Sequence, residues 1–305
     1  MKIYDLIIIG AGPAGITASV YAARKQLDFL VISLDVGGQA AWSGEVENYT
    51  GYQFISGPEL ARKFEEHLRR YGTLLKENEE VRLLEKTGSR ILVRTNQADY
   101  QARSVIIASG KKSRELGVAG EKEFKNRGLT YCATCDGPLF AGKVVAVVGG
   151  GNSALDAAWQ LVRIAKHVYL LNNTAALGGD PVVRAKVEQS KNVTILNNVQ
   201  MTAVLGERFV NRIRFSSPGQ ENELEVAGVF VEIGLVPNSD FAKGVDRNSQ
   251  NEIIVDCHNR TNLEGVFAAG DVTNVPEKQI IIAAGEGSKA LLSAFHYLAV
   301  NNFND

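Results

Sequence analysis

Two glycine-rich turns, each between an apolar segment and an expected helix, constrain the fold of this chain more than any other feature. The first, GAGPAG at 10–15, follows the apolar run 3–9, and the second, GGGNSA at 149–154, follows 144–148. In such turns glycines permit a tight bend, and the start of the following helix offers unpaired N–H groups to a pyrophosphate. One such motif is a weak indication. Two, each correctly placed between strand and helix, predict two dinucleotide-binding units.

Further apolar segments repeat in the same way and indicate the fold class. Residues 105–110 and 229–234 each end at a glycine, and residues 265–271 end at Asp271. Taken alone, each is an ordinary buried strand followed by a turn. Together they predict an α/β chain with two Rossmann-like, three-layer dinucleotide-binding domains, the second inserted in the first. Two dinucleotides in one chain indicate a flavin and a nicotinamide.

A CxxC pair, Cys132 and Cys135, lies just before the second glycine-rich turn. This spacing allows the two thiols to close a small disulfide, and it commonly lowers the pKa of one of them toward neutrality. A structural zinc site would need four ligands, but Cys257 has no partner at zinc-binding spacing and the four histidines are scattered. The pair therefore predicts a redox-active dithiol without a metal, and we interpret Cys257 as a bystander.

The overall charge excludes several classes of partner. The 305 residues include 33 basic and 34 acidic residues spread along the chain, which gives a net charge of -1. Without a strongly basic stretch, neither nucleic acid nor a membrane surface is an expected partner. The N-terminus has neither a basic region with a cleavage site nor an apolar run of about twenty residues, so we expect a cytoplasmic protein.

Longer motifs give the chain a family resemblance over its whole length. They are GAGPAG, GGQ with EVEN, CATCDGPLF, GGGNSALDAA and GVFAAGDVTNVPEKQIIIAAGEGSKA. On these motifs the chain resembles the low-molecular-weight thioredoxin reductases, and in particular the C-terminal reductase portion of the flavoprotein subunit of alkyl hydroperoxide reductase. That subunit carries an additional N-terminal shuttle module, whereas this sequence begins at its flavin motif. We therefore expect a separate thioredoxin- or glutaredoxin-like protein as the electron acceptor.

The resemblance implies a discontinuous domain organisation. An FAD-binding domain would comprise residues 1–113 and 245–305, and an NAD(P)H-binding domain of residues 114–244, carrying the CxxC, would be inserted in it. The charged segment 111–120 with its two glycines and the proline at 237 fit the linkers that such an insertion needs. The resemblance also implies a homodimer.

Individual residues take roles from the same resemblance. Cys135 matches the sulfur beside the flavin, Cys132 the sulfur that attacks the partner disulfide, and Asp136 the acid that protonates the leaving thiolate, a role that needs a carboxyl whose pKa is raised by burial. From the sequence alone, Asp136 could equally cap a helix or lie in an exposed turn. The positions that match flavin contacts are Gly10, Gly12, Pro13, Ala14, Gly15, Gly37, Gly38, Gln39, Asn48, Val81, Ser109, Gly110, Gly270, Asp271, Lys278, Gln279 and Ile280. The second glycine-rich turn supplies the nicotinamide-nucleotide candidates Gly149, Gly151, Asn152, Ser153 and Ala154.

One departure from the family bears on the choice of nicotinamide cofactor. The expected strand 167–171 ends at Asn172, where NADPH-using relatives have a His-Arg-Arg cluster, and no Arg or Lys occurs between Lys166 and Arg184. A 2'-phosphate without a nearby cation would be poorly held. The acidic residue that usually binds the NAD ribose is also missing, and Asn172 replaces it or merely begins a turn. The pattern favours NADH over NADPH.

The combined features predict a flavin-dependent disulfide oxidoreductase. Electrons would pass from NADH through FAD and the CxxC dithiol to the disulfide of a thioredoxin- or glutaredoxin-like protein. Two other classes of function stay open at this point. The first is a dithiol oxidase that passes electrons from a small substrate to oxygen, and the second is a non-catalytic flavoprotein in which Cys132 and Cys135 are structural.

Overall fold

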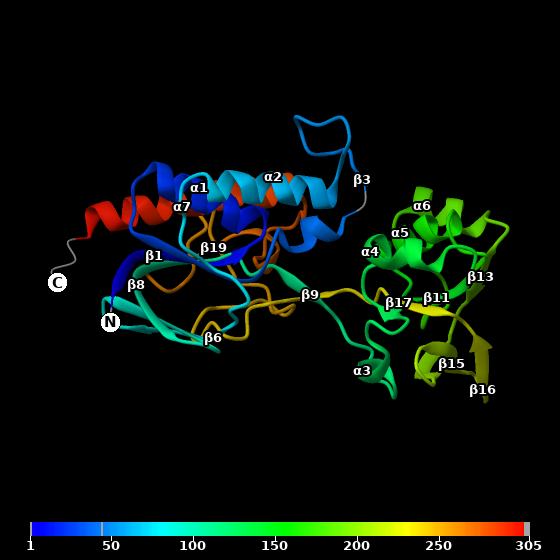
Figure 1. Ribbon diagram of the computed structural model, residues 1–305. Helices are drawn as coiled ribbons and strands as arrows, with labels where there is room; N and C mark the ends of the chain where they lie inside the picture. The colour runs from blue at the N-terminus through cyan, green and yellow to red at the C-terminus, as the bar shows by residue number, and fades with distance from the viewer. Residues whose placement is uncertain (1, 44, 302–305) are drawn as a thin grey trace. The chain divides into compact units, whose positions relative to one another are not determined.

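The computed structural model describes residues 2–43 and 45–301, and it describes no side chain for Trp42, Glu45 and Cys135. The chain forms two compact units (Figure 1). The first consists of Met1–Lys112 and Val236–Asp305, and the second of Ser113–Leu235. Each unit has a parallel or largely parallel sheet with further layers on both faces, which confirms the predicted fold class.

The first unit is built on a seven-stranded sheet in the order β5-β2-β1-β8-β7-β6, with β19 also paired to β8. A short sheet of β3 and β4 lies apart from it, and β9 pairs with β18 where the chain crosses between the units. The elements are β1 (Ile3–Ala11), α1 (Pro13–Arg24), β2 (Phe29–Val36), η1 (Gly38–Trp42), β3 (Glu45–Val46), β4 (Ile55–Ser56), α2 (Gly57–Arg69), β5 (Leu75–Lys76), β6 (Val81–Thr87), β7 (Arg90–Thr95), β8 (Asp99–Ile107), β9 (Lys111–Ser113), β18 (Leu235–Pro237), β19 (Val266–Ala268), η3 (Gly270–Val272) and α7 (Ile280–Val300).

The central strands of this sheet are apolar on both faces because both faces are covered. In β1, Ile7 and Ile9 point into one core, and Leu6 and Ile8 point into the other, as the two-residue period of a strand requires. Helices α1 and α7 pack on the Leu6 side and against each other (Figure 1). Residues of β6, β7 and the segment 242–272 complete the core on the Ile7 side.

The second unit has a five-stranded parallel sheet in the order β10-β17-β11-β12-β13 and an antiparallel sheet of β14, β15 and β16. Helices α5 and α6 cover one face of the parallel sheet, and the antiparallel sheet covers the other. The elements are α3 (Glu121–Phe124), β10 (Leu129–Thr130), α4 (Ala133–Asp136), η2 (Gly137–Phe140), β11 (Val144–Val148), α5 (Asn152–Val162), β12 (His167–Leu171), α6 (Pro181–Glu188), β13 (Val193–Leu196), β14 (Gln200–Gly206), β15 (Val210–Ser217), β16 (Gln220–Glu225) and β17 (Gly228–Val231).

Both glycine-rich turns lie where the strand order reverses. β1 pairs with β2 on one side and β8 on the other, and β11 pairs with β12 and β17 in the same way. Connections leave such a central strand in opposite directions, so a crevice opens beyond its carboxyl end. The two turns therefore occupy the positions at which parallel α/β sheets bind ligands.

The second boundary between the units differs from the sequence-based domain division. Residues 236–244, which that division assigns to the inserted domain, belong to the first unit. The reason is packing and pairing with β6: Ala242 and Val245 are buried in the core that contains Leu84, and the Leu84 N–H donates to the Phe241 carbonyl at 2.8 Å. The chain therefore rejoins the first unit at Val236, nine residues earlier than the sequence-based division places it.

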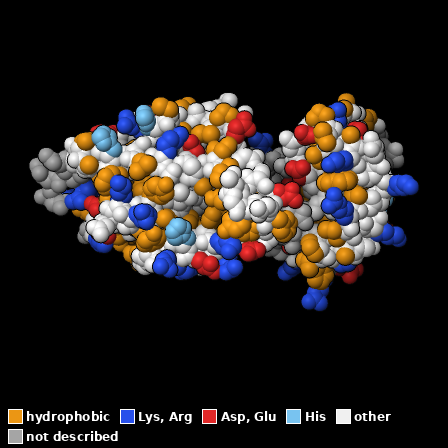
Figure 2. All heavy atoms as spheres, turned by 90° about the horizontal axis from the view of Figure 1, so that it is seen from above, with side chains coloured by type: hydrophobic (Ala, Val, Ile, Leu, Met, Phe, Trp, Pro, Cys, Tyr) orange, Lys and Arg blue, Asp and Glu red, His pale blue; other side chains and the backbone are white. Residues whose placement is uncertain are grey.

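The surface agrees with the near-zero net charge. The face drawn in Figure 2 shows basic and acidic side chains interspersed, without a large field of either sign. Within residues 2–43 and 45–301, no helix is both long enough and apolar enough to cross a membrane.

A glycine pair on α7 tests the packing of α7 on α1. A Cβ added to Gly287 would lie 2.0 Å from the Ala14 carbonyl oxygen, whereas one added to Gly285 would meet nothing within 4 Å. We expect Gly287→Ala to lower the free energy of unfolding by about 1–3 kcal/mol through overpacking. Gly285→Ala, the matched control, should leave it unchanged or raise it by up to about 1 kcal/mol, because alanine favours helix. Urea unfolding followed by circular dichroism measures both, and equal effects would contradict the packing.

Candidate functional site

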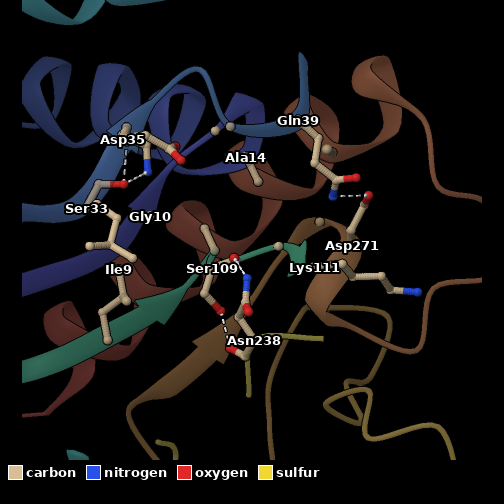
Figure 3. A pocket seen from close by; sticks show the side chains of 18 of the residues that line it. Ile9, Gly10, Ala14, Ser33, Asp35, Gln39, Ser109, Lys111, Asn238 and Asp271 are labelled. Carbon is tan, nitrogen blue, oxygen red and sulfur yellow. Dashed lines mark hydrogen bonds between the residues drawn. The ribbon is translucent and has the colours of Figure 1, made fainter. Parts of the chain in front are cut away.

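A cavity of about 820 Å³ in the first unit collects most of the residues predicted to bind a flavin (Figure 3). It is large enough for a substantial part of a cofactor. The predicted residues that line it are Gly10, Gly12, Pro13, Ala14, Gly38, Gln39, Val81, Ser109, Gly110, Gly270, Asp271, Lys278, Gln279 and Ile280. Gly15, Gly37 and Asn48 do not line it.

The first glycine-rich turn needs glycine for close backbone packing. Gly10 has a φ of 105°, and a Cβ there would lie 2.3 Å from the Ala108 carbonyl oxygen. A Cβ on Gly15 would lie 1.8 Å from the Gly10 carbonyl oxygen. Helix α1 begins directly after this turn, and no side chain caps its first N–H groups. The turn therefore leaves backbone donors for an anion in the cavity.

Hydrogen bonds join distant segments around this cavity (Figure 3). The Ser109 hydroxyl donates to the Asn238 carbonyl at 2.6 Å, and Asn238 Nδ2 donates to the Ser109 carbonyl at 2.9 Å. Gln39 Nε2 donates to Asp271 Oδ2 at 3.4 Å. Burial raises the pKa of Asp271, although the nearby Lys278 and Lys111 act in the opposite direction. These contacts join four segments that line the cavity.

Two predicted flavin residues outside the lining have structural contacts that explain their positions. Gly37 has a φ of 94°, and a Cβ there would lie 2.7 Å from the Ala61 Cβ, so it permits the close approach of the 37–39 turn to α2. Asn48 Nδ2 donates to Gln279 Oε1 at 3.0 Å, which links the 48 region to a residue that does line the cavity.

An ion-pair cluster beside the cavity was not predicted from the sequence. Glu252 lies 3.1 Å from both Lys111 Nζ and Lys278 Nζ, and the two lysines line the cavity. Burial acts to raise the pKa of Glu252, but hydrogen bonds from Asn248, Lys111 and Lys278 together hold it below its ordinary value. The cluster fixes both ammonium groups at the cavity wall. No local pattern identifies it, because its members come from three separate segments.

The second glycine-rich turn repeats the geometry of the first. Gly149 has a φ of 142°, and a Cβ there would lie 2.1 Å from the Glu232 carbonyl oxygen. Ala154 is buried behind it, and α5 begins after Gly151 without a side-chain cap. Ser153 is exposed, and Asn152 Oδ1 accepts from the Asp180 N–H at 2.7 Å. The Asn152 side chain therefore anchors the loop before α6.

Asn172 closes a turn. Its side chain is buried, and Nδ2 donates to the Thr174 carbonyl at 3.1 Å and to Asn197 Oδ1 at 2.9 Å. Oδ1 accepts from the Thr174 N–H and from the Thr174 hydroxyl. The single Thr174 hydroxyl proton lies within reach of both Asn172 Oδ1 and the Ala176 carbonyl. Asn172 therefore closes a turn, and its role in binding the nicotinamide nucleotide stays a prediction.

The CxxC begins the short helix α4 in the second unit. Cys132 is in a disulfide, its N–H donates to Thr130 Oγ1 at 3.1 Å, and its carbonyl accepts from the Asp136 N–H at 3.2 Å. The side chain of Cys135 lies outside the described residues, so the predicted pairing stays a prediction. Asp136 ends α4 and is partly exposed. Cys257 is free and exposed, and the described residues contain no group of His, Cys, Asp and Glu that could hold a metal.

Comparison with known proteins decides the family. The model of the pyridine nucleotide-disulphide oxidoreductase family matches residues 4–287, almost the whole chain. The chain belongs to the pyridine nucleotide-disulphide oxidoreductase family. Membership implies an oxidoreductase that uses FAD and a pyridine nucleotide.

Individual relatives narrow the likeness within the family. The chain is 42% identical over 301 residues to an NADH dehydrogenase of Ferdinandcohnia aciditolerans, covering 98% of this chain and 58% of that protein. It is 42% identical over 303 residues to a subunit of the alkyl hydroperoxide reductase of Escherichia coli, covering 97% and 58%. It thus spans somewhat under three fifths of the length of these curated relatives.

Solved structures match along their full length. The thioredoxin reductase of Lactococcus lactis superimposes with a TM-score of 0.87 at 32% identity, covering 97% of this chain and 99% of that one. The thioredoxin reductase of T. acidophilum gives 0.85 at 37% identity with the same coverage. The resemblance to thioredoxin reductases and to the hydroperoxide reductase subunit, inferred from motifs, is therefore confirmed.

The sequence-based prediction missed several residues of this oxidoreductase that the structure places at its glycine-rich turns. Ser33 and Asn238 are examples: the Ser33 hydroxyl accepts from the Ala11 N–H, and Asn238 bonds Ser109. Glu232 is another, because its carbonyl oxygen packs on Gly149. Only Asn238 had a usable signal, since it ends the Val236-Pro237-Asn238 run beside a proline.

Proposed function

We propose that this protein is a flavin-dependent disulfide oxidoreductase that passes electrons from NADH through FAD and a CxxC dithiol to the disulfide of a thioredoxin- or glutaredoxin-like protein. The observation that carries this proposal is the disulfide at Cys132 in the same unit as the second glycine-rich turn. A disulfide at the head of a CxxC helix is an acceptor for two electrons. We place its action in the cytoplasm, as a homodimer.

The first unit is the proposed FAD-binding domain. The cavity volume, the uncapped start of α1 and the glycine contacts, which leave no room for a Cβ, all fit a dinucleotide. FAD supplies reversible two-electron chemistry between the nicotinamide and the disulfide. The chain would bind its pyrophosphate at 10–15, while Asp271 and Gln39, which also line the cavity, would orient the cofactor. Lys278, Gln279 and Ile280 lie at the start of α7, where we place the isoalloxazine.

The second unit is the proposed NADH-binding domain. Its turn at Gly149, Gly151, Asn152, Ser153 and Ala154 has the same backbone contact as the FAD turn and the same uncapped helix start. The residues 173–183 contain no Arg or Lys, and the Asn172 amide is hydrogen-bonded to Thr174 and Asn197. A 2'-phosphate would therefore find no cation in this loop. The name NADH dehydrogenase among the relatives supports the same choice.

Within the CxxC we assign distinct tasks. Cys135 would exchange electrons with the flavin, Cys132 would attack the acceptor disulfide, and Asp136 would give the leaving thiolate its proton. Relatives named as subunits of alkyl hydroperoxide reductase and structures of thioredoxin reductases support a thioredoxin-fold acceptor. The partial exposure of Cys132 and Asp136 supports access by another protein.

The cofactor choice gives a first test. We expect NADH to bleach the flavin faster than NADPH in stopped-flow absorbance at matched concentrations. The double variant Asn173→Arg, Ala175→Arg adds two cations at exposed positions. It should raise the rate of flavin bleaching by NADPH, at subsaturating concentration, by roughly tenfold to a hundredfold, because a charge-assisted hydrogen bond contributes about 1.5–3 kcal/mol. Asn172 stays intact in this variant because its amide closes the turn.

The control for this test adds the same charge elsewhere in the unit. Gln220→Arg, on exposed β16, should leave the preference unchanged. Equal or faster bleaching of the unmodified protein by NADPH would show that the cofactor assignment is wrong.

The cysteine roles give a second test. We expect Cys132→Ser and Cys135→Ser each to abolish reduction of a thioredoxin-fold acceptor, while NADH still bleaches the flavin, because hydride transfer precedes dithiol exchange. In Cys132→Ser a long-wavelength thiolate-to-flavin absorption band should persist, since Cys135 is assigned to the flavin. Cys257→Ser, at the free exposed cysteine, should retain full activity. Finding the band only in Cys135→Ser would reverse the two roles.

A further inference from the structure

Glu232 follows β17 and lies directly beside the second glycine-rich turn. Its N–H donates to the Val148 carbonyl at 2.8 Å, and its carbonyl oxygen occupies the space that a Cβ on Gly149 would need. The first unit has Ala108 in the equivalent place against Gly10, and Ala108 lines the cavity there. At equivalent positions of the two units, the first therefore has the methyl side chain of Ala108 and the second has the carboxyl side chain of Glu232.

The Glu232 carboxyl reaches from this sheet edge to the CxxC. It accepts a hydrogen bond from the N–H of Ala133, the residue that follows Cys132 and begins α4. Two other side chains hold the same turn: Thr130 accepts from the Cys132 N–H, and the Thr134 hydroxyl donates to Gln160 at 3.1 Å. Of these three anchors, Glu232 is the one that can carry a charge.

The surroundings of Glu232 disfavour its anionic form. Burial raises its pKa to about 8, and the hydrogen bond from Ala133 only partly opposes this. Asp156 of α5 is the charged group that acts on it, and it raises the pKa further. The pKa of Asp156 is itself raised by burial and by Asp180. In the described part of the chain, the interactions resolved on the Glu232 carboxyl thus include no cation.

We propose that Glu232 is a positioning residue for the redox-active turn, which it holds through the Ala133 amide and in which its charge opposes the thiolate form of Cys132. This inference rests on the proposed function, because it concerns the same CxxC. Cys132 directly precedes Ala133, whose N–H donates to the Glu232 carboxyl, and anionic groups at neighbouring positions raise each other's pKa. A thiol ordinarily has a pKa near 8.5, and burial raises the pKa of Glu232 to about 8, so ionisation of one group would oppose ionisation of the other in the same pH range.

The consequence is a coupling between the redox state and one proton. In the disulfide form the turn has no thiolate, and Glu232 is free to ionise above about pH 8. When the disulfide is reduced and a thiolate forms, Glu232 takes up a proton from solution in the pH range where both groups titrate. A neutral carboxyl still offers its carbonyl oxygen to the Ala133 N–H, so the turn keeps its anchor in both states.

The experiment follows Cys132 ionisation in the FAD-loaded protein. In a Cys135→Ser background, the rate of iodoacetamide alkylation at Cys132 is measured from pH 6 to 10 by peptide mass spectrometry, with Cys257 as an internal reference in the same molecule. We expect two titration steps with Glu232 present. Glu232→Gln, which keeps the acceptor oxygen and removes the charge, should give a single step about one pH unit below the original upper step.

Two further variants separate charge from position. Glu225→Gln, the same change on exposed β16, should leave the two-step profile unaltered. Glu232→Ala, tested with both cysteines present, removes the acceptor as well, so we expect slower closure of the Cys132 disulfide by oxidised glutathione than in Glu232→Gln. A Glu232→Gln profile that superimposes on that of Glu225→Gln would overturn the electrostatic part. Equal closure rates in the Gln and Ala variants would overturn the positioning part.

A measurement on the unmodified protein keeps the proposal testable if a variant fails to fold. Infrared difference spectra between the disulfide and dithiol forms at pH 8, with dithiothreitol as the reductant, should show a carboxylic-acid carbonyl signal that grows on reduction. Absence of that signal would overturn the coupling. Neither readout uses NADH or a protein acceptor, so failure of the proposed electron path would not affect them.

Discussion

Close backbone contact at two glycines is the constraint on which the rest of this structure depends. Gly10 packs on the Ala108 carbonyl, and Gly149 packs on the Glu232 carbonyl, each at a distance that excludes any side chain. Each contact brings the turn after a central strand against the end of the neighbouring strand. This places an uncapped helix start at the crevice where the strand order reverses. The same local solution, used twice, gives one chain two dinucleotide-binding units. In the proposed path, one further redox group is needed to carry electrons from the flavin to an acceptor disulfide.

We assign that role to the disulfide at Cys132, which lies in the same unit as the second turn. The turn that carries it is anchored by Thr130, Gln160 and Glu232, which come from β10, α5 and the end of β17. Because Glu232 also packs on the glycine turn, one residue contacts both the nucleotide-binding loop and the redox helix. If the proposed function holds, Glu232 links the NADH-binding turn with the reactive dithiol inside a single unit.

The sequence predicted the duplicated architecture because strand period, glycine position and helix start are local signals. It could not predict contacts between residues that are far apart in the chain. The bonds between Ser109 and Asn238 and between Gln39 and Asp271 join such segments, as does the contact of Glu232 with Ala133. Asn172 shows the limit most clearly. Its type fits both a ribose contact and a turn, and the sequence does not reveal that Thr174 and Asn197 hold its amide in a turn.

The central claim is that the flavin and the disulfide form one electron path. The most direct test compares the number of NADH equivalents consumed with the number of free thiols formed. The FAD-loaded protein is titrated anaerobically with NADH, and free thiols are counted after each addition. The account predicts uptake of about two equivalents of NADH per chain, one for the disulfide and one for the flavin. The thiol count should rise from the single Cys257 to all three cysteines. Uptake of one equivalent, with the flavin bleached and only one thiol detected, would contradict the account.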